Sequence, residues 1–285
     1  MSDIVRFGPS GNDILFYEQG FKSTIQAMPW VAQRGLSAFE ISFGRGIRMS
    51  EETARAIGQQ AAKHGVLISA HAPYFINLAR EFEKSYMYIE KSLKLLKLLG
   101  GRNLVVHTGS QGELSRSLAM KNCKENFRRV FAALEKNPEF ADFDFRICPE
   151  TMGRFSSIGD HREVCEICSI HERLVPTLDF GHMNCLLQGG LSRDGAVNEI
   201  MDYCMQHVSA QKMKNVHIHF SPVKFGQKGE LSHLDFVSAP EIFTPPFVPL
   251  AKYIKSKNLA PTIICESAER MAQDSVTLLK TFEKV

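Results

Sequence analysis

The sequence predicts a single-domain α/β protein of the (β/α)8 TIM-barrel class. Eight short apolar runs alternate with longer stretches of helical spacing, and no strand–GxGxxG–helix signature of an open dinucleotide-binding sheet is present. Most of the apolar runs also end in an ionisable residue. A closed barrel of this class takes roughly 250 residues as one domain, and the chain has 285. We therefore expect one barrel over residues 1–285, with its active site at the C-terminal strand ends.

The apolar runs are short and continuous, which is typical of parallel strands that are buried on both faces. They recur about every 36 residues, close to the spacing that a strand, a crossover helix and two loops require. The expected strands are Ile4–Gly8, Ala38–Ser42, Val66–His71, Asn103–His107, Phe145–Glu150, Leu174–Asp179, Asn215–His219 and Thr262–Glu266.

Between these strands, apolar residues recur with helical spacing. One connection, residues 220–248, shows no such pattern, and a loop of that length in a compact domain usually serves a function or is disordered. The expected helices are Glu51–His64, Lys84–Leu99, Ser115–Leu134, His161–His171, Asp194–Val208, Pro249–Lys257 and Ala272–Glu283.

Composition narrows the class of protein. The net charge is +3, and no block of five basic residues is present, which argues against a purely electrostatic nucleic-acid tail. The first residues carry no apolar run typical of a signal peptide, and no stretch of about 18 apolar residues suggests a membrane span. Seven irregularly spaced cysteines predict a reduced, cytoplasmic protein.

Ionisable side chains close six consecutive predicted strands. In a parallel barrel all these strand ends lie on one rim, where active sites are built. Burying several carboxylates and imidazoles together is costly unless cations compensate them, and these groups are the donors that zinc prefers. The pattern therefore predicts a metal site, formed from His71, His107, Glu150, Asp179, His182, His217, His219 and Glu266.

Short motifs around these residues resemble the endonuclease IV family of apurinic/apyrimidinic endonucleases. They run in order along residues 4–270, and each is weak alone. The motifs are His71-Ala-Pro-Tyr74-Phe-Ile-Asn77, Val106-His107-Thr-Gly-Ser, Pro149-Glu150-Thr, Leu178-Asp179-Phe-Gly-His182, His217-Ile-His219-Phe and Cys265-Glu266-Ser.

The resemblance implies a hydrolase with three zinc ions, with manganese as an alternative. Hydroxide formed at the metals would attack the phosphorus of double-stranded DNA at abasic sites, and the protein would act as a monomer. By this resemblance Glu150 bridges two metals and is the catalytic residue, while Tyr74, Phe75 and Arg45 contact the DNA. The implied metal ligands are His71, His107 and Glu150 for one ion, Glu150, Asp179, His217 and Glu266 for a second, and His182 and His233 for a third.

The sequence departs from the family pattern at two of these sites. The third site usually ends in Asp-x-His, whereas this chain has Leu231-Ser-His233, so the expected Asp is missing and Glu230 is a possible substitute. The family usually has Asn two residues after its strand-seven ligand, and this chain has His219 there. We expect His217 to be the ligand, with His219 as an additional ligand or a supporting group.

Two alternatives remain open at this level. A single-metal sugar isomerase or epimerase of the related xylose-isomerase-like barrels needs only Glu150, Asp179, His217 and Glu266. A metal- or nucleic-acid-binding module without catalysis would explain the absent Asp. The additional histidines at positions 71, 107 and 182 favour the nuclease, because a one-metal isomerase does not need them.

Overall fold

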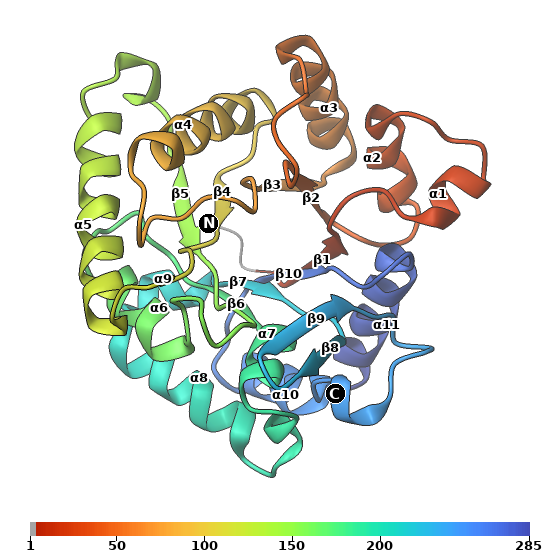
Figure 1. The fold of residues 1–285 in the computed structure, drawn as a ribbon. Coiled ribbons are helices and arrows are strands. Elements are labelled where there is room, and N and C mark those ends of the chain that lie inside the picture. Colours follow the sequence, from red (N-terminus) through yellow and green to blue (C-terminus); the bar gives the residue numbers. More distant parts are fainter. Residues whose placement is uncertain (1–3) are drawn as a thin grey trace.

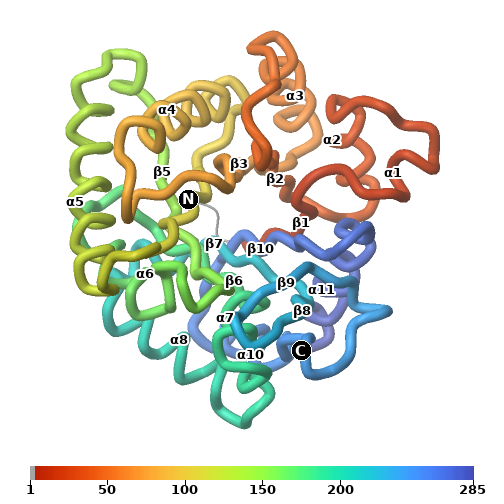
Figure 2. The backbone as a smooth tube through the Cα atoms, in the orientation of Figure 1, coloured from red at the N-terminus to blue at the C-terminus, as the bar shows by residue number. Residues whose placement is uncertain are grey.

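The computed structural model describes residues 4–285 and forms a closed parallel barrel with helices outside it (Figure 1). The barrel order is β1-β2-β3-β4-β5-β6-β7-β10, and the backbone trace returns to β1 beside β10 (Figure 2). The barrel strands are β1 (Arg6–Pro9), β2 (Ala38–Ser42), β3 (Leu67–His71), β4 (Asn103–Val106), β5 (Arg146–Pro149), β6 (Thr177–Asp179), β7 (His217–His219) and β10 (Thr262–Cys265).

Two seams close the barrel where regular pairing is interrupted. β5 and β6 are joined by the parallel bridges Ile147–Leu174 and Glu150–Thr177. β1 and β2 approach so closely that a Cβ added at Gly8 would lie 1.8 Å from the backbone oxygen of Ala38. Glycine is therefore required at that position, because any side chain would force the two strands apart.

The helices begin and end where local signals predict. α3 matches the expected residues because the Ser50 side chain caps its first turn and Gly65, with φ of 67°, ends it. The other long helices lie within a few residues of their predicted bounds. The α-helices are α1 (Ile14–Glu18), α2 (Thr24–Ala32), α3 (Glu51–His64), α4 (Glu83–Leu98), α5 (Arg116–Leu134), α6 (His161–Cys168), α7 (Phe180–Leu186), α8 (Ala196–His207), α9 (Ala210–Lys214), α10 (Phe247–Ser256) and α11 (Met271–Lys284).

The long connection 220–248 carries structure that its sequence does not predict. It contains an antiparallel hairpin of β8 (Val223–Gly226) and β9 (Gly229–His233), followed by a short 3-10 turn, Glu241–Phe243. The hairpin lies beside α7. It therefore adds side chains to the barrel rim beyond those of the barrel strands.

Candidate metal centre

The predicted donors lie at the C-terminal rim of the barrel, as the strand ends suggested. His71 and Asp179 are the last residues of β3 and β6, while His107, Glu150 and Glu266 directly follow β4, β5 and β10. His182 follows Asp179 within α7, and His233 is the last residue of β9. Among the described residues, three adjoining groups at this rim have donor atoms within 4.8 Å of one another: His71, His107 and Glu150; Glu150, Asp179, His219 and Glu266; and His182, Glu230 and His233.

Glu150 belongs to two of these groups and is completely buried. Its Oε2 atom lies 3.2 Å from Nε2 of His71 and 2.9 Å from Nε2 of His107. Its Oε1 atom lies 2.8 Å from Nδ1 of His219. The two carboxylate oxygens thus face different sets of imidazoles, which is the arrangement that a carboxylate bridging two cations needs.

Asp179 combines a structural and a chemical role. Its Oδ1 atom accepts a hydrogen bond from the backbone N of His182 at 2.8 Å and so caps α7. The buried Oδ2 atom has no hydrogen-bond partner among the described residues. Nδ1 of His182 lies 3.2 Å from it as an ion pair. A carboxylate oxygen without a hydrogen bond at this depth is unfavourable, so its position fits a cation in the group with Glu150 and Glu266.

Backbone carbonyls orient two of the histidines. Nδ1 of His71 donates to the carbonyl of Ala72 at 2.7 Å, and Nδ1 of His182 donates to the carbonyl of Thr151 at 2.9 Å. In the neutral imidazole the proton therefore lies on Nδ1. Nε2 is then unprotonated and points toward the donor group to which the histidine belongs. This is the usual way in which a protein prepares a histidine as a metal ligand.

A β-bulge in the hairpin completes the third group. Glu230 and His233 are three residues apart, so they would point to opposite faces of a regular strand. The pairing with β8 passes from Ser232 directly to Glu230, which makes Leu231 the additional residue of a bulge. Leu231 is exposed, and Glu230 Oε2 lies 3.6 Å from Nε2 of His182. Glu230, one residue before the position where the resemblance implies an Asp, therefore lies with His182 and His233.

His219, rather than His217, joins the central carboxylates. β7 pairs with β6 so that His219 is level with Asp179, while His217 is level with Thr177, deeper in the barrel. Nδ1 of His219 lies 3.2 Å from Glu266, and Nε2 of His217 lies 2.9 Å from Glu40. Among the described residues, His219 and not the expected His217 therefore lies in the group with Glu150, Asp179 and Glu266, while His217 groups with Glu40.

Glu40 forms a further group of close donors with His217 and His219, and the sequence analysis did not select it. It lies in β2 between Phe39 and Ile41 and is completely buried. The sequence did indicate a buried partner for Glu40, because a carboxylate inside an apolar strand needs one.

The carboxylates and imidazoles shift one another's protonation in the metal-free protein. Burial alone would lower the pKa of His71, but the hydrogen bond and charge of Glu150 outweigh burial and raise the pKa to about 9. For His182, burial is outweighed by the charges of Asp179 and Glu150, and the pKa is again raised to about 9. Burial would raise the pKa of Glu266, but His219 lowers it to about 2. In the metal-free protein, His71 and His182 therefore hold additional protons at positions where cations could bind.

A cavity of about 570 Å³ opens above the donor groups. Tyr74 and Phe75, both predicted to contact a substrate, line it, and Tyr74 stacks on His107 with ring centroids 5.7 Å apart. Arg154 also lines the cavity, and its side chain is largely exposed. Arg45, which the sequence analysis also expects to contact the substrate, is exposed but is not among the residues that line the cavity.

The helices of residues 4–285 give no candidate for a membrane span, because none is both long and apolar enough.

Sequence comparison relates the chain to one family and to a relative without assigned function. The family described as xylose isomerase-like TIM barrel matches residues 28–282. An uncharacterized protein from Methanocaldococcus jannaschii is 28% identical over 282 residues, which cover 98% of this chain and 97% of the relative.

Solved structures with two different activities share the fold. Endonuclease IV from Thermus thermophilus superposes with a TM-score of 0.69 at 19% identity, covering 98% of this chain and 100% of that one. D-psicose 3-epimerase from Clostridium cellulolyticum superposes with a TM-score of 0.67 at 12% identity, covering 93% and 94% of the two chains. At these identities the likeness establishes the fold, and the activity must be argued from the donor groups.

Proposed function

The chain belongs to the xylose isomerase-like TIM barrel family, and on that premise we propose that it is a zinc-dependent phosphodiesterase that cuts double-stranded DNA at abasic sites. The observation that carries this proposal is the number of donor groups. Three adjoining donor groups lie at one rim. Two of them share Glu150, and the third contacts Glu150 through His182. A single-metal enzyme has no need of the second and third groups.

The donors fit zinc, which binds imidazole nitrogen and carboxylate oxygen. His71, His107 and Glu150 would hold one ion, and His182, Glu230 and His233 another. The ion between them would be held by Glu150, Asp179, His219 and Glu266. When bound, such ions lower the pKa of water and neutralise charge on phosphate oxygens.

The protein's own side chains supply positioning. Glu150 keeps two donor groups together, because each of its oxygens faces a different group. Tyr74 and Phe75 are 53% and 41% exposed at the mouth of the cavity, where aromatic rings can stack on unpaired bases. Arg154 brings a cation to the same cavity and pairs with a phosphate of the DNA backbone. Arg45, outside the cavity, contacts the flanking DNA.

A second candidate function has one specific observation in its favour. The four donors Glu150, Asp179, His219 and Glu266 would by themselves hold a single divalent ion, as a sugar isomerase or epimerase requires. In that reaction the bound ion would polarise a ketose, and two carboxylates would move the proton. The other two donor groups would then have no catalytic task.

Metal content and strand scission test the proposal together. Purified protein is expected to contain two or three zinc ions per chain, measured by elemental analysis. It should incise a duplex with one abasic site, lose that activity with a chelator and regain it with zinc. The matched duplex without the abasic site is the control and should stay intact. One manganese or magnesium ion per chain, with no incision, would favour the isomerase or epimerase.

Zinc affinity is expected to increase with pH up to about pH 9. Below that pH, the imidazoles of His71 and His182 each carry a second ring proton in the metal-free protein, and a bound ion must displace it. Each displaced proton contributes about a tenfold change in affinity per pH unit. Titration against a competing chromophoric chelator at pH 6.5, 7.5 and 8.5 would measure this slope. An affinity independent of pH would mean that these histidines are not ligands.

We extend the proposal to the cellular setting. All seven cysteines are free and buried, in agreement with a reducing compartment such as the cytoplasm. We propose that the protein acts there as a monomer, as the resemblance implies.

A further inference from the structure

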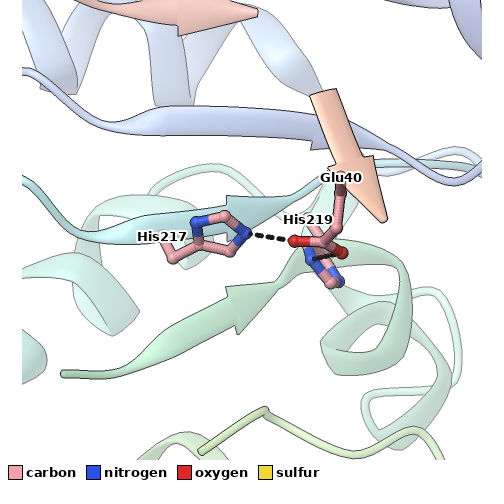
Figure 3. Close-up of side chains that lie close together, drawn as sticks. All are labelled: Glu40, His217 and His219. Carbon is pink, nitrogen blue, oxygen red and sulfur yellow. Dashed lines mark hydrogen bonds and ion pairs between the residues drawn. The ribbon is translucent and has the colours of Figure 1, made fainter. Parts of the chain in front are cut away.

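A fully buried cluster lies inside the barrel, beneath the group of Glu150, Asp179, His219 and Glu266. It consists of Glu40 from β2 and of His217 and His219 from β7, and their polar atoms point toward one another (Figure 3). All three side chains are inaccessible to solvent. A carboxylate at this depth is tolerated only where its oxygens are hydrogen-bonded or paired with charge.

Side chains of neighbouring strands face both oxygens of Glu40, although Oε1 forms no hydrogen bond within the described residues. Its Oε2 atom accepts a hydrogen bond from Oγ of Ser69 at 2.8 Å and lies 2.9 Å from Nε2 of His217. Its Oε1 atom lies 3.1 Å from Nε2 of His219. An ionised carboxylate only accepts hydrogen bonds, so Nε2 of His217 carries the proton that Oε2 accepts. The negative charge of Oε1 beside Nε2 of His219 favours a proton on that nitrogen as well.

Asn103 determines the same tautomer for His217 independently. The amide nitrogen of Asn103 lies 3.5 Å from Nδ1 of His217. An amide nitrogen only donates, so Nδ1 of His217 accepts and the ring proton stays on Nε2, facing Glu40. The direction of the hydrogen bonds therefore runs from Asn103 through His217 to Glu40.

Both nitrogens of His219 face buried carboxylates, on opposite sides of the ring, and a cation in the donor group would replace the proton on Nδ1. Nε2 faces Glu40, while Nδ1 faces Glu150 at 2.8 Å and Glu266 at 3.2 Å, on the side of the donor group. A cation in that group can take the lone pair of Nδ1 only while Nε2 keeps its proton. We propose that Glu40 is a positioning residue that holds His219 as the Nε2-protonated tautomer and so makes Nδ1 the metal-binding nitrogen. This inference rests on the proposed metal centre and adds a supporting carboxylate to it.

The variant Glu40→Gln tests this role without deleting side-chain volume. A glutamine can present its NH₂ group to His219, which would move the ring proton to Nδ1 and block the metal. Loss of such a supporting partner typically costs 10- to 100-fold in metal affinity. We expect a loss of that size for the ion at Glu150, Asp179 and Glu266, measured by chelator competition. The ion at His182, Glu230 and His233 should keep its affinity, because none of these three residues contacts Glu40.

Ser69→Ala is the matched control. It removes a hydrogen bond to the other oxygen of the same carboxylate and leaves the contact between Glu40 and His219 in place. It should lower the unfolding temperature without changing zinc affinity. Equal affinity losses in both variants would overturn the proposal, because they would reflect general loosening of the barrel. A folded Glu40→Gln protein with unchanged affinity at every site would overturn it too.

A second measurement uses the natural protein and does not depend on any variant folding. Long-range ¹H–¹⁵N correlation spectra of the zinc-loaded protein distinguish protonated, free and metal-bound ring nitrogens. We expect His219 to show a protonated Nε2 and a metal-bound Nδ1. A metal-bound Nε2 or a protonated Nδ1 would overturn the role of Glu40 while leaving the proposed function standing. A protein that binds no zinc would overturn both.

Discussion

Glu150→Gln is expected to reduce zinc-dependent incision at an abasic site on the order of 1000-fold. The substitution keeps the size of the side chain but removes the charge that faces His71, His107 and His219. Without that charge the two adjoining ions would lose their shared ligand. Single-turnover incision rates at saturating zinc, compared with the natural protein, measure the loss.

The same variant should remain folded but become less stable without metal. In the metal-free protein Glu150 balances imidazoles whose pKa values are raised, and its own pKa is held well below its usual range. Removing one partner of a buried ion pair costs roughly 3–5 kcal/mol. Glu199→Gln, which removes an exposed carboxylate paired with Arg193, is the control and should leave incision and stability nearly unchanged. If Glu150→Gln keeps more than a tenth of the activity, Glu150 is not the bridge.

His219→Gln and His217→Gln are expected to differ sharply in metal binding. Glutamine in place of His219 removes the nitrogen that faces Glu150 and Glu266, so one zinc ion should bind at least about 100-fold more weakly. Glutamine in place of His217 can still donate to Glu40 through its NH₂ group, so affinity should change less than about tenfold.

The two histidine variants control each other, because both remove a buried imidazole from β7. Zinc stoichiometry and chelator competition on both proteins, together with circular dichroism to verify folding, separate the two roles. The reverse order of affinities would restore His217 as the ligand. Equal and small losses would mean that neither histidine binds metal.

Most of the barrel could be predicted from local patterns. The run Thr262–Cys265 is apolar and short, and the helix Glu51–His64 is bounded by Ser50 and Gly65, so each could be located without tertiary information. α2 was missed because Pro29 lies inside it, and proline usually interrupts a helix. The hairpin β8–β9 was missed because its strands are short and interrupted by a bulge.

The types of donor side chain at the candidate site were easier to predict from the sequence than which of these donors lie together. The donor types and their common rim followed from what ends each strand, and the named histidines and carboxylates other than His217 lie in the three groups at that rim. Glu230 was considered only as a possible substitute for a missing Asp. In a regular strand, its spacing of three residues from His233 would put the two side chains on opposite faces. The bulge at Leu231 removes that objection.

By itself, the sequence determined which side chains turn into the barrel, since alternation along a strand is a local property with a period of two. Both His217 and His219 satisfy it equally. Only the tertiary structure decided which of them meets Asp179, because the height of a side chain in a barrel depends on register between strands distant in sequence. The same non-local register brought Glu40 beneath the donor group, where no local pattern could place it.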